Sequence, residues 1–154
     1  MRRGRAEGAG AGRVSGPTMA FAAAAGGAAL ILWNLAVGGA SVTAAFSVAP
    51  SIIRRGETGT FRYRITRNVG WKPVGVAGRR ATFAIAPSAN GRIVSLTDHE
   101  GNVLTVNASG GSSTTDEAGE VVVVVHVNAA GPMTLSATDA RQQTAETTSF
   151  SGIP

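Results

Sequence analysis

The sequence predicts an all-β fold, an antiparallel β-sandwich over residues 41–154, preceded by one apolar N-terminal helix. From Ala44 onward, short stretches alternate apolar and polar residues, which is the pattern of half-buried strands. Segments rich in Gly, Pro, Asn and Asp separate these stretches at intervals typical of a sandwich. Five consecutive valines, Val121–Val125, indicate a central strand because β-branched side chains pack well on a pleated surface.

The most regular stretch, residues 114–138, predicts a turn, a long strand, a tight connection and a second strand. Asp116 and Gly119 suit the turn, since an Asp side chain can cap it and Gly tolerates positive φ. The odd-numbered valines from 121 to 127 share one face of the first strand, which we expect to face the core.

Weaker patterns predict the other elements. Strands are expected at residues 46–48, 60–66, 81–86, 93–96 and 103–106, with a last edge strand at 145–150. The long connection at 68–78 is expected to turn Trp71 and Val74 inward. Residues 108–115 are expected to form a Ser/Gly loop leading into the valine strand.

The N-terminal region predicts membrane association. Residues 1–18 are polar and basic and are expected to be a disordered cytoplasmic tail. Residues 19–40 carry no charge and are long enough to cross a bilayer as one helix. Arginines precede this run and none follows before Arg54, so the positive-inside rule places residues 41–154 outside the bacterial inner membrane, on the periplasmic or extracytoplasmic side.

Two interpretations of residues 19–40 compete. An uncleaved signal anchor would leave a single-pass membrane protein with a cytoplasmic N-terminus. A signal peptide cleaved at a small-x-small site near residues 42–45 would release a secreted or surface-displayed binding module. The apolar run exceeds the usual length of a signal-peptide core, which favours the anchor.

The composition of the apolar run suggests that it packs against other membrane helices. Two small-xxx-small pairs, Ala22 with Gly26 and Ala23 with Gly27, allow close helix approach. Asn34 lies within the run, where an amide usually finds a partner on a neighbouring helix. These features predict other membrane subunits and the lipid bilayer as partners. The alternative is that an Ala/Gly-rich segment only reflects the GC-rich genome of a bacterium.

Charge is segregated along the chain. Residues 51–80 carry eight basic side chains and one acidic one, whereas residues 81–154 carry two basic and seven acidic ones. No nucleic-acid-binding motif accompanies the basic segment, so we discount DNA and RNA. The alternatives for it are docking on anionic headgroups or an acidic partner, and a mixed solvated surface. The candidate basic patch consists of Arg54, Arg55, Arg62, Arg64, Arg67, Arg79 and Arg80.

The sequence gives no basis for a catalytic, cofactor or metal site. It has no cysteine, which excludes thiolate chemistry and Cys-ligated metals. Of its two histidines, His99 lies in the acidic turn Asp98-His99-Glu100, where a weak cation site competes with an ordinary solvated hairpin tip. His126 has Val124 and Asn128 two residues away, and no ligand set is predicted around it. We therefore expect a protein that is not an enzyme and that binds no cofactor.

Several segments resemble a known family. Lys72-Pro73-Val74-Gly75-Val76 followed by residues 81–85 is similar to the "P-V-x-G-x-x-V-x-F" stretch of bacterial immunoglobulin-like domains of the invasin and intimin type. Residues 115–121 resemble their "T-D-x-x-G-x-a" turn, and residues 130–137 resemble their closing "A-G-x-x-x-v-x-A". The resemblance covers about residues 44–150, in a single copy. It implies an immunoglobulin-like sandwich with a binding or spacer role and no catalytic residues.

In this sandwich type the strand beside the valine strand is expected to be the strand that contains Phe83. Small or apolar outward residues of the two strands would then form one smooth uncharged patch, a candidate protein-contact surface. Its members are Thr82, Ala84, Ala86, Val122, Val124 and His126. Together these features predict an accessory or scaffold subunit of a larger membrane complex, for example a respiratory or photosynthetic one.

Overall fold

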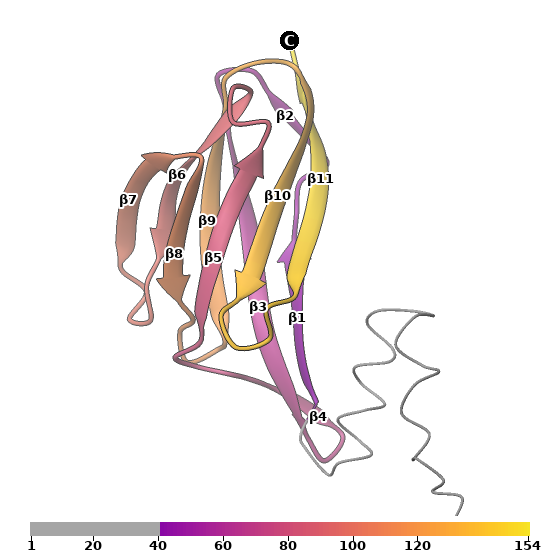
Figure 1. Cartoon of the computed structure of the whole chain (residues 1–154), viewed down its shortest axis with the longest axis vertical. Coiled ribbons are helices and arrows are strands. Elements are labelled where there is room, and N and C mark those ends of the chain that lie inside the picture. The colour runs from indigo at the N-terminus through magenta and orange to yellow at the C-terminus, as the bar shows by residue number, and fades with distance from the viewer. Residues whose placement is uncertain (1–40) are drawn as a thin grey trace, which may run out of the picture. The chain divides into compact units, whose positions relative to one another are not determined.

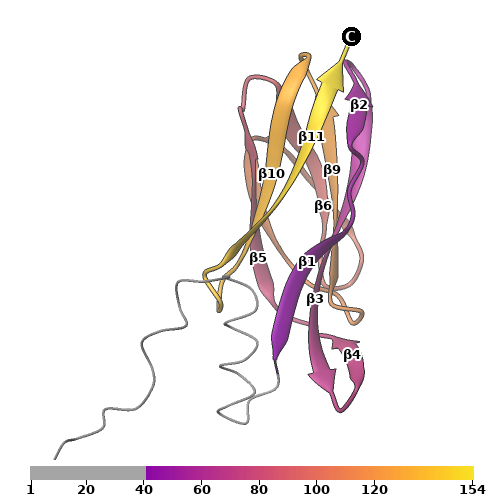
Figure 2. The same ribbon diagram turned by 90° about the vertical axis from the view of Figure 1, so that its right-hand side faces the viewer.

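In the computed structural model, which describes residues 41–154, two β-sheets pack face to face (Figures 1 and 2). The expected tail at 1–18 and the apolar segment at 19–40, with Ala22, Ala23, Gly26, Gly27 and Asn34, lie outside the described residues. Among residues 41–154, no helix has the length and apolarity needed to cross a membrane.

All described elements are strands, which confirms the all-β prediction. Sheet A has the order β1 (Val42–Val48), β3 (Thr58–Val69), β9 (Glu120–Val127), β6 (Gly91–Thr97), β7 (Val103–Ala108), and β4 (Lys72–Gly75) also pairs with β3. Sheet B has the order β2 (Ile52–Arg54), β11 (Ala145–Ile153), β10 (Gly131–Asp139), β5 (Arg80–Ala86), β8 (Gly110–Thr114). Every pairing is antiparallel except that of β2 with β11, which is parallel.

The core lies between the sheets and contains the residues that the alternating patterns place inside. The odd-numbered valines of β9, from Val121 to Val127, are fully buried, and so are Phe61 and Tyr63 of β3. Aromatic rings connect the layers: the ring centroids of Tyr63 and Phe83 lie 5.5 Å apart, and those of Phe61 and Phe150 lie 5.0 Å apart. Such tilted and edge-on pairs add to the stabilisation from apolar burial.

Four strands differ from the sequence expectation, and one of them, β4, lies within the connection that was expected at residues 68–78. Residues 110–114, expected in a loop, form β8, because β5 supplies the pairing that their Gly/Ser composition does not favour by itself. The three-residue strand β2 was not predicted and pairs with β11. The last strand was expected at an edge, but β11 lies between β2 and β10.

The expectation that Trp71 and Val74 turn inward is wrong. Strand β3 continues to Val69 and forms a hairpin with β4 through the turn Gly70-Trp71. Gly70 has a φ of +63°, which suits this two-residue turn. Figure 2 shows this hairpin extending past the end of the other strands of the sandwich. Because no opposing sheet covers the hairpin, Trp71 is fully exposed.

Two glycines allow β4 and β9 to meet end to end along the same edge of β3. The amide of Ile65 donates to the carbonyl of Gly119 (2.8 Å), and the amide of Val76 donates to the carbonyl of Ile65 (2.9 Å). A Cβ atom on Gly75 would collide with the carbonyl of Ala118, and one on Gly119 would lie 2.6 Å from the amide nitrogen of Val76. This junction therefore depends on both glycines.

The buried phenol of Tyr63 predicts an alkaline limit to stability. It is the chain's only tyrosine, and its hydroxyl has no hydrogen-bond partner among the described residues. Burial, and then the charges of Asp139 and Glu146, raise its pKa above the ordinary 10.0. Above pH 10 the unfolded chain releases this proton and the folded chain keeps it, so stability falls as the pH rises.

We expect this loss to reach about 1.4 kcal/mol per pH unit above the ordinary tyrosine pKa. Phenolate absorbance should then appear only together with unfolding, followed by circular dichroism. In Tyr63→Phe, this part of the alkaline loss should disappear. Phenolate formation near the ordinary pKa in protein that stays folded would contradict the expectation.

Candidate binding surfaces

The predicted uncharged patch is divided between the two sheets, which corrects the expectation about neighbouring strands. The valine strand β9 pairs with β3 and β6 in sheet A, whereas β5 pairs with β10 and β8 in sheet B. Because outward side chains of the two sheets point in opposite directions, Thr82, Ala84 and Ala86 lie on one outer face. Val122, Val124 and His126 lie on the other.

The outer face of sheet B extends the β5 half of the predicted patch. Ala84 of β5 lies opposite Ser136 of β10, and Ser136 lies opposite Thr147 of β11, so small residues continue across three strands. We call this surface the hydroxyl face. Its members, all at least partly exposed, are Thr82, Ala84, Ala86, Thr134, Ser136, Thr138, Thr147, Ser149 and Ser151.

No member of the hydroxyl face is charged, and in Figure 1 its strands β5, β10 and β11 form the front of the molecule. At the Ala86 end, a shallow hollow of about 510 Å³ is lined by Pro87, Pro132, Ser149 and Ser151, among others. The arrangement offers methyl and hydroxyl groups on a rigid sheet, which suits contact with a protein surface or a polyhydroxylated ligand.

The outer face of sheet A is less accessible. Val122 and Val124 are half-buried, and the amide of Val122 donates to the hydroxyl of Thr97 (2.8 Å). Beside them, Glu120 forms ion pairs with Arg62 (3.3 Å) and Arg64 (3.8 Å). This half of the predicted patch therefore has paired charges beside Val122, and neutral neighbours, Thr60 and Ser95, on either side of Val124.

His126 is half-buried on the same outer face. Its Nδ1 atom lies within hydrogen-bond distance, 3.0 Å, of Oδ1 of Asn128. Across the strands, His126 lies opposite Thr58 and Arg92. No acidic residue is its direct cross-strand neighbour, and the contacts are those of a surface histidine.

The seven arginines of the predicted basic patch do not form one patch. Arg79 forms a buried ion pair with Asp139, and Arg80 donates to the hydroxyl of Ser112 on sheet B. The Arg55 side chain donates to the carbonyl of Asn128, near the end where β2 lies. The other members are Arg54 on β2, the Glu120-paired Arg62 and Arg64, and Arg67 near the β3–β4 hairpin.

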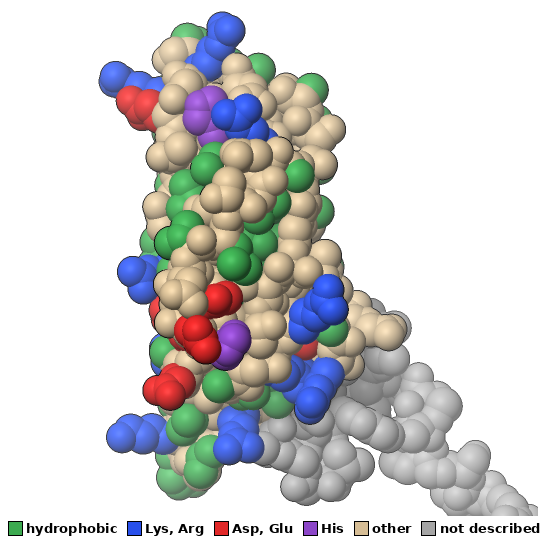
Figure 3. Space-filling view, turned by 90° about the vertical axis from the view of Figure 1, so that its left-hand side faces the viewer, with side chains coloured by type: hydrophobic (Ala, Val, Ile, Leu, Met, Phe, Trp, Pro, Cys, Tyr) green, Lys and Arg blue, Asp and Glu red, His purple; other side chains and the backbone are tan. Residues whose placement is uncertain are grey.

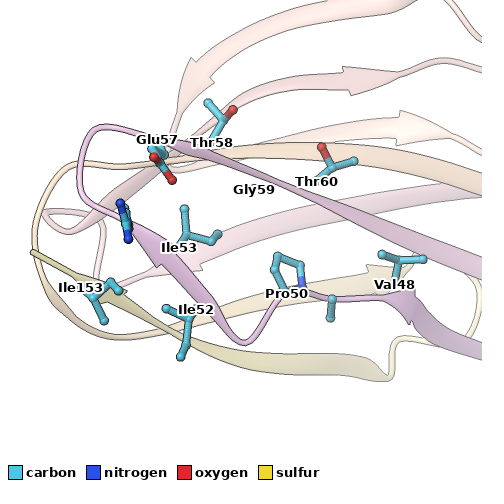
Figure 4. Close-up of a pocket in the computed structure, with 11 residues that line it drawn as sticks. Val48, Pro50, Ile52, Ile53, Glu57, Thr58, Gly59, Thr60 and Ile153 are labelled. Atoms are coloured by element: carbon cyan, nitrogen blue, oxygen red, sulfur yellow. The ribbon is translucent and has the colours of Figure 1, made fainter.

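A groove of about 500 Å³, lined by apolar residues and by Arg54, Glu57, Thr58 and Thr60, follows the chain where it leaves sheet A for sheet B (Figure 4). Strand β1 pairs with β3 only as far as Arg62, so the segment of β3 from Thr58 to Thr60 has no β1 neighbour. Pro50, Ile52 and Ile53 line the groove on the opposite side.

The edge formed by β7 is also apolar. Val103 is 69% exposed and Leu104 is 41% exposed, and neither strand residue carries a charge. Figure 3, which views this side, shows apolar side chains between groups of charged ones at the two ends. An uncharged edge strand can accept another strand.

The acidic turn at residues 98–102 uses its carboxylate internally. Oδ1 of Asp98 accepts from the amides of Glu100 (2.9 Å) and Asn102 (2.8 Å). The Asn102 side chain, which also donates to Asp98, is the main cause of the lowered pKa of Asp98. In the described part of the chain, no three His, Cys, Asp or Glu side chains come together as metal ligands. The contacts are those of a turn.

Comparisons with known proteins agree on the fold. No family model matches the chain, and no curated protein does. Domains 4 and 5 of the S-layer protein SbsC superpose with a TM-score of 0.50 and 12% identity over 75% of this chain and 54% of that one. A beta-glycosidase from Bacteroides vulgatus superposes with a TM-score of 0.51 and 15% identity. This match covers 73% of this chain and 14% of the enzyme.

A C-terminal intimin fragment, solved with the intimin-binding domain of its translocated receptor, gives a TM-score of 0.49 and 17% identity. This match covers 73% of the present chain and 33% of the fragment. The chain thus spans about half of the S-layer fragment and a smaller part of the other two. The similarity to the S-layer domains shows a two-layer β-sandwich, which agrees with the immunoglobulin-like sandwich that the resemblance implied.

Proposed function

We propose that this chain is a non-enzymatic, membrane-anchored accessory subunit of a larger bacterial membrane complex. In this proposal residues 19–40 stay uncleaved as a single helix with the N-terminus in the cytoplasm. The sandwich lies outside the membrane and contacts partner subunits. The observation that carries the binding role is the hydroxyl face, a broad uncharged surface on a rigid sheet.

The hydroxyl face supports a protein-contact role for physical reasons. Its small side chains lose little conformational entropy when they are covered, and exposed hydroxyls can exchange water for hydrogen bonds with a partner. The absence of charge among its members removes the desolvation penalty that ionised groups impose on an interface.

Two sequence features support the anchor. Residues 19–40 are uncharged over a length that matches the hydrocarbon core of a bilayer, and arginines precede them. The small-residue pairs Ala22/Gly26 and Ala23/Gly27 and the amide of Asn34 would then contact neighbouring helices of the complex.

A charge on the hydroxyl face is expected to release the protein from its complex. Ala84→Glu would bury an unpaired carboxylate in the interface, which should weaken association by about 2 kcal/mol or more, roughly 30-fold. Complex size in mild detergent, followed by native electrophoresis of solubilised membranes, measures the effect.

The matched control is Ala45→Glu, which adds the same charge to an exposed alanine on sheet A, opposite Arg64. Thermal melts of both variants check that they fold. If Ala84→Glu stays in the complex as well as Ala45→Glu does, the hydroxyl face is not the contact surface.

Intact mass distinguishes the anchored subunit from a cleaved binding module. Protein from native membranes should have the full 15.5 kDa and co-purify with stoichiometric membrane partners. A mass that lacks the residues before the sandwich would refute the anchor and favour a secreted or surface-displayed module.

A further inference from the structure

The β3–β4 hairpin carries the most exposed aromatic side chain of the described residues. Trp71 lies in its two-residue turn and is 103% exposed, and the neighbouring Val69 and Val74 are 54% and 42% exposed. An indole with no protein contact is unusual, because aromatic side chains stabilise proteins mainly through burial. The three residues define what we call the hairpin tip.

Two cations accompany the hairpin tip. Arg67 lies opposite Val74, and Val69 lies opposite Lys72. Because residues paired across two strands share a face of the sheet, Arg67 and Lys72 lie on the same face as the two valines. Within residues 41–154, no ion pair joins either cation to an acidic side chain. The hairpin thus combines an indole, two aliphatic side chains and two positive charges.

Hydrogen bonds hold the hairpin next to Ser41, the first described residue. Ser41, the first residue after the apolar segment 19–40, accepts a hydrogen bond at its carbonyl from the amide of Asn68 (3.2 Å). The Asn68 side chain also donates to the Ser41 hydroxyl (3.3 Å). Trp71 follows Asn68 by three residues, which span at most about 10 Å of extended chain.

We propose that the hairpin tip inserts into the headgroup layer of a membrane that contains anionic lipids. The inference rests on the proposed function, because the bilayer is the one that residues 19–40 cross. Tryptophan is enriched at this layer, since its ring is apolar and its N–H group remains hydrogen-bonded. Arg67 and Lys72 bind the lipid phosphates, and the valines contact the upper acyl chains. The hairpin thereby gives the sandwich a second attachment to the membrane.

Tryptophan fluorescence of the full chain tests this proposal. Trp71 is one of two tryptophans, so Trp33→Phe leaves it as the only tryptophan, which can be excited selectively beside Tyr63. The protein is reconstituted into vesicles of phosphatidylcholine with phosphatidylglycerol. We expect blue-shifted Trp71 emission, quenching by lipids brominated near the headgroup, and protection from acrylamide.

The control probe has a tryptophan at the other end of the sandwich, in Trp33→Phe/Trp71→Phe/Ile52→Trp. Ile52 is 59% exposed on β2, which lies far from the β4 hairpin in Figure 1. Its emission should stay water-like, with full acrylamide quenching and none by brominated lipid. If Trp71 behaves like this control, the inference is wrong.

Removing the cations tests the choice of anionic lipid. The docking equilibrium constant should fall about fivefold for each of Arg67→Ser and Lys72→Ser, as expected from about 1 kcal/mol per charge. Equal docking on pure phosphatidylcholine, or no change in these variants, would refute a role for anionic lipid. Protection of Trp71 in native membranes but not in lipid vesicles would identify a protein as the occupant and overturn the proposal.

Alkaline carbonate extraction of the same vesicles separates this inference from the proposed function. A chain that washes off the vesicles refutes the anchor and, with it, the inference. A chain that stays in the membrane while Trp71 remains accessible to acrylamide refutes the inference alone.

Discussion

Asp139→Ala is expected to lower the free energy of unfolding by about 3–5 kcal/mol, because it leaves a buried arginine without its counter-ion. Only 1% of the Asp139 side chain and 11% of that of Arg79 are exposed. Both carboxylate oxygens accept from the guanidinium, and Oδ1 also accepts from the amide of Arg141 (3.1 Å). Urea unfolding measures the change.

Two further variants make this prediction specific. Asp98→Ala removes another aspartate that accepts turn amides, but in an exposed turn, and should destabilise far less than Asp139→Ala. The double variant Arg79→Met/Asp139→Leu removes both charges and should regain most of the loss. A loss for Asp139→Ala no larger than that for Asp98→Ala would show that the pair contributes little.

Gly119→Ala is expected to destabilise the fold by about 3–5 kcal/mol, from backbone strain and steric overlap together. Gly119 has a φ of +76°, and a Cβ atom there would overlap the carbonyl of Ile65 and lie 2.6 Å from the amide nitrogen of Val76. Both are backbone atoms held by hydrogen bonds of the β3–β4–β9 junction, so neither can move cheaply. Thermal or urea unfolding gives the magnitude.

Gly78→Ala is the matched control. Gly78 has a similar φ of +71°, but no atom lies within 4 Å of an added Cβ. Its replacement should show only the cost of the left-handed backbone, about 1–2 kcal/mol. Equal losses for the two variants would mean that the junction yields and that the overlap at Gly119 is relieved.

The sequence correctly predicted the features that follow from the alternation of apolar and polar side chains along a strand. The buried faces of β3, β5, β9 and β10 follow directly from side chains that alternate with a period of two. It failed where tertiary pairing overrides weak local preference, as in β8, whose glycines and serines form a strand beside β5. It also failed at Trp71, because an apolar residue indicates burial only where another layer lies opposite.

The candidate surface was predicted in part. Thr82, Ala84 and Ala86 do lie exposed on one strand, but their neighbour is β10, not the valine strand. Alternation tells which residues share a face of a strand, but not which strands are adjacent, since that depends on the order of strands in each sheet. The same limit applies to the arginines, whose partners Glu120 and Asp139 lie more than fifty residues away in sequence.

The parallel pairing of β2 with β11 bears on how the sandwich responds to tension. Strand β1 starts at one end of the sandwich and β11 ends at the other (Figure 1). A pull between Val42 and Ile153 therefore runs along the strands and loads β1 against β3 and β2 against β11 in shear. In shear, the hydrogen bonds of a pairing must break together rather than one at a time. This geometry predicts that the two terminal pairings resist an end-to-end pull better than pairings that are opened one hydrogen bond at a time.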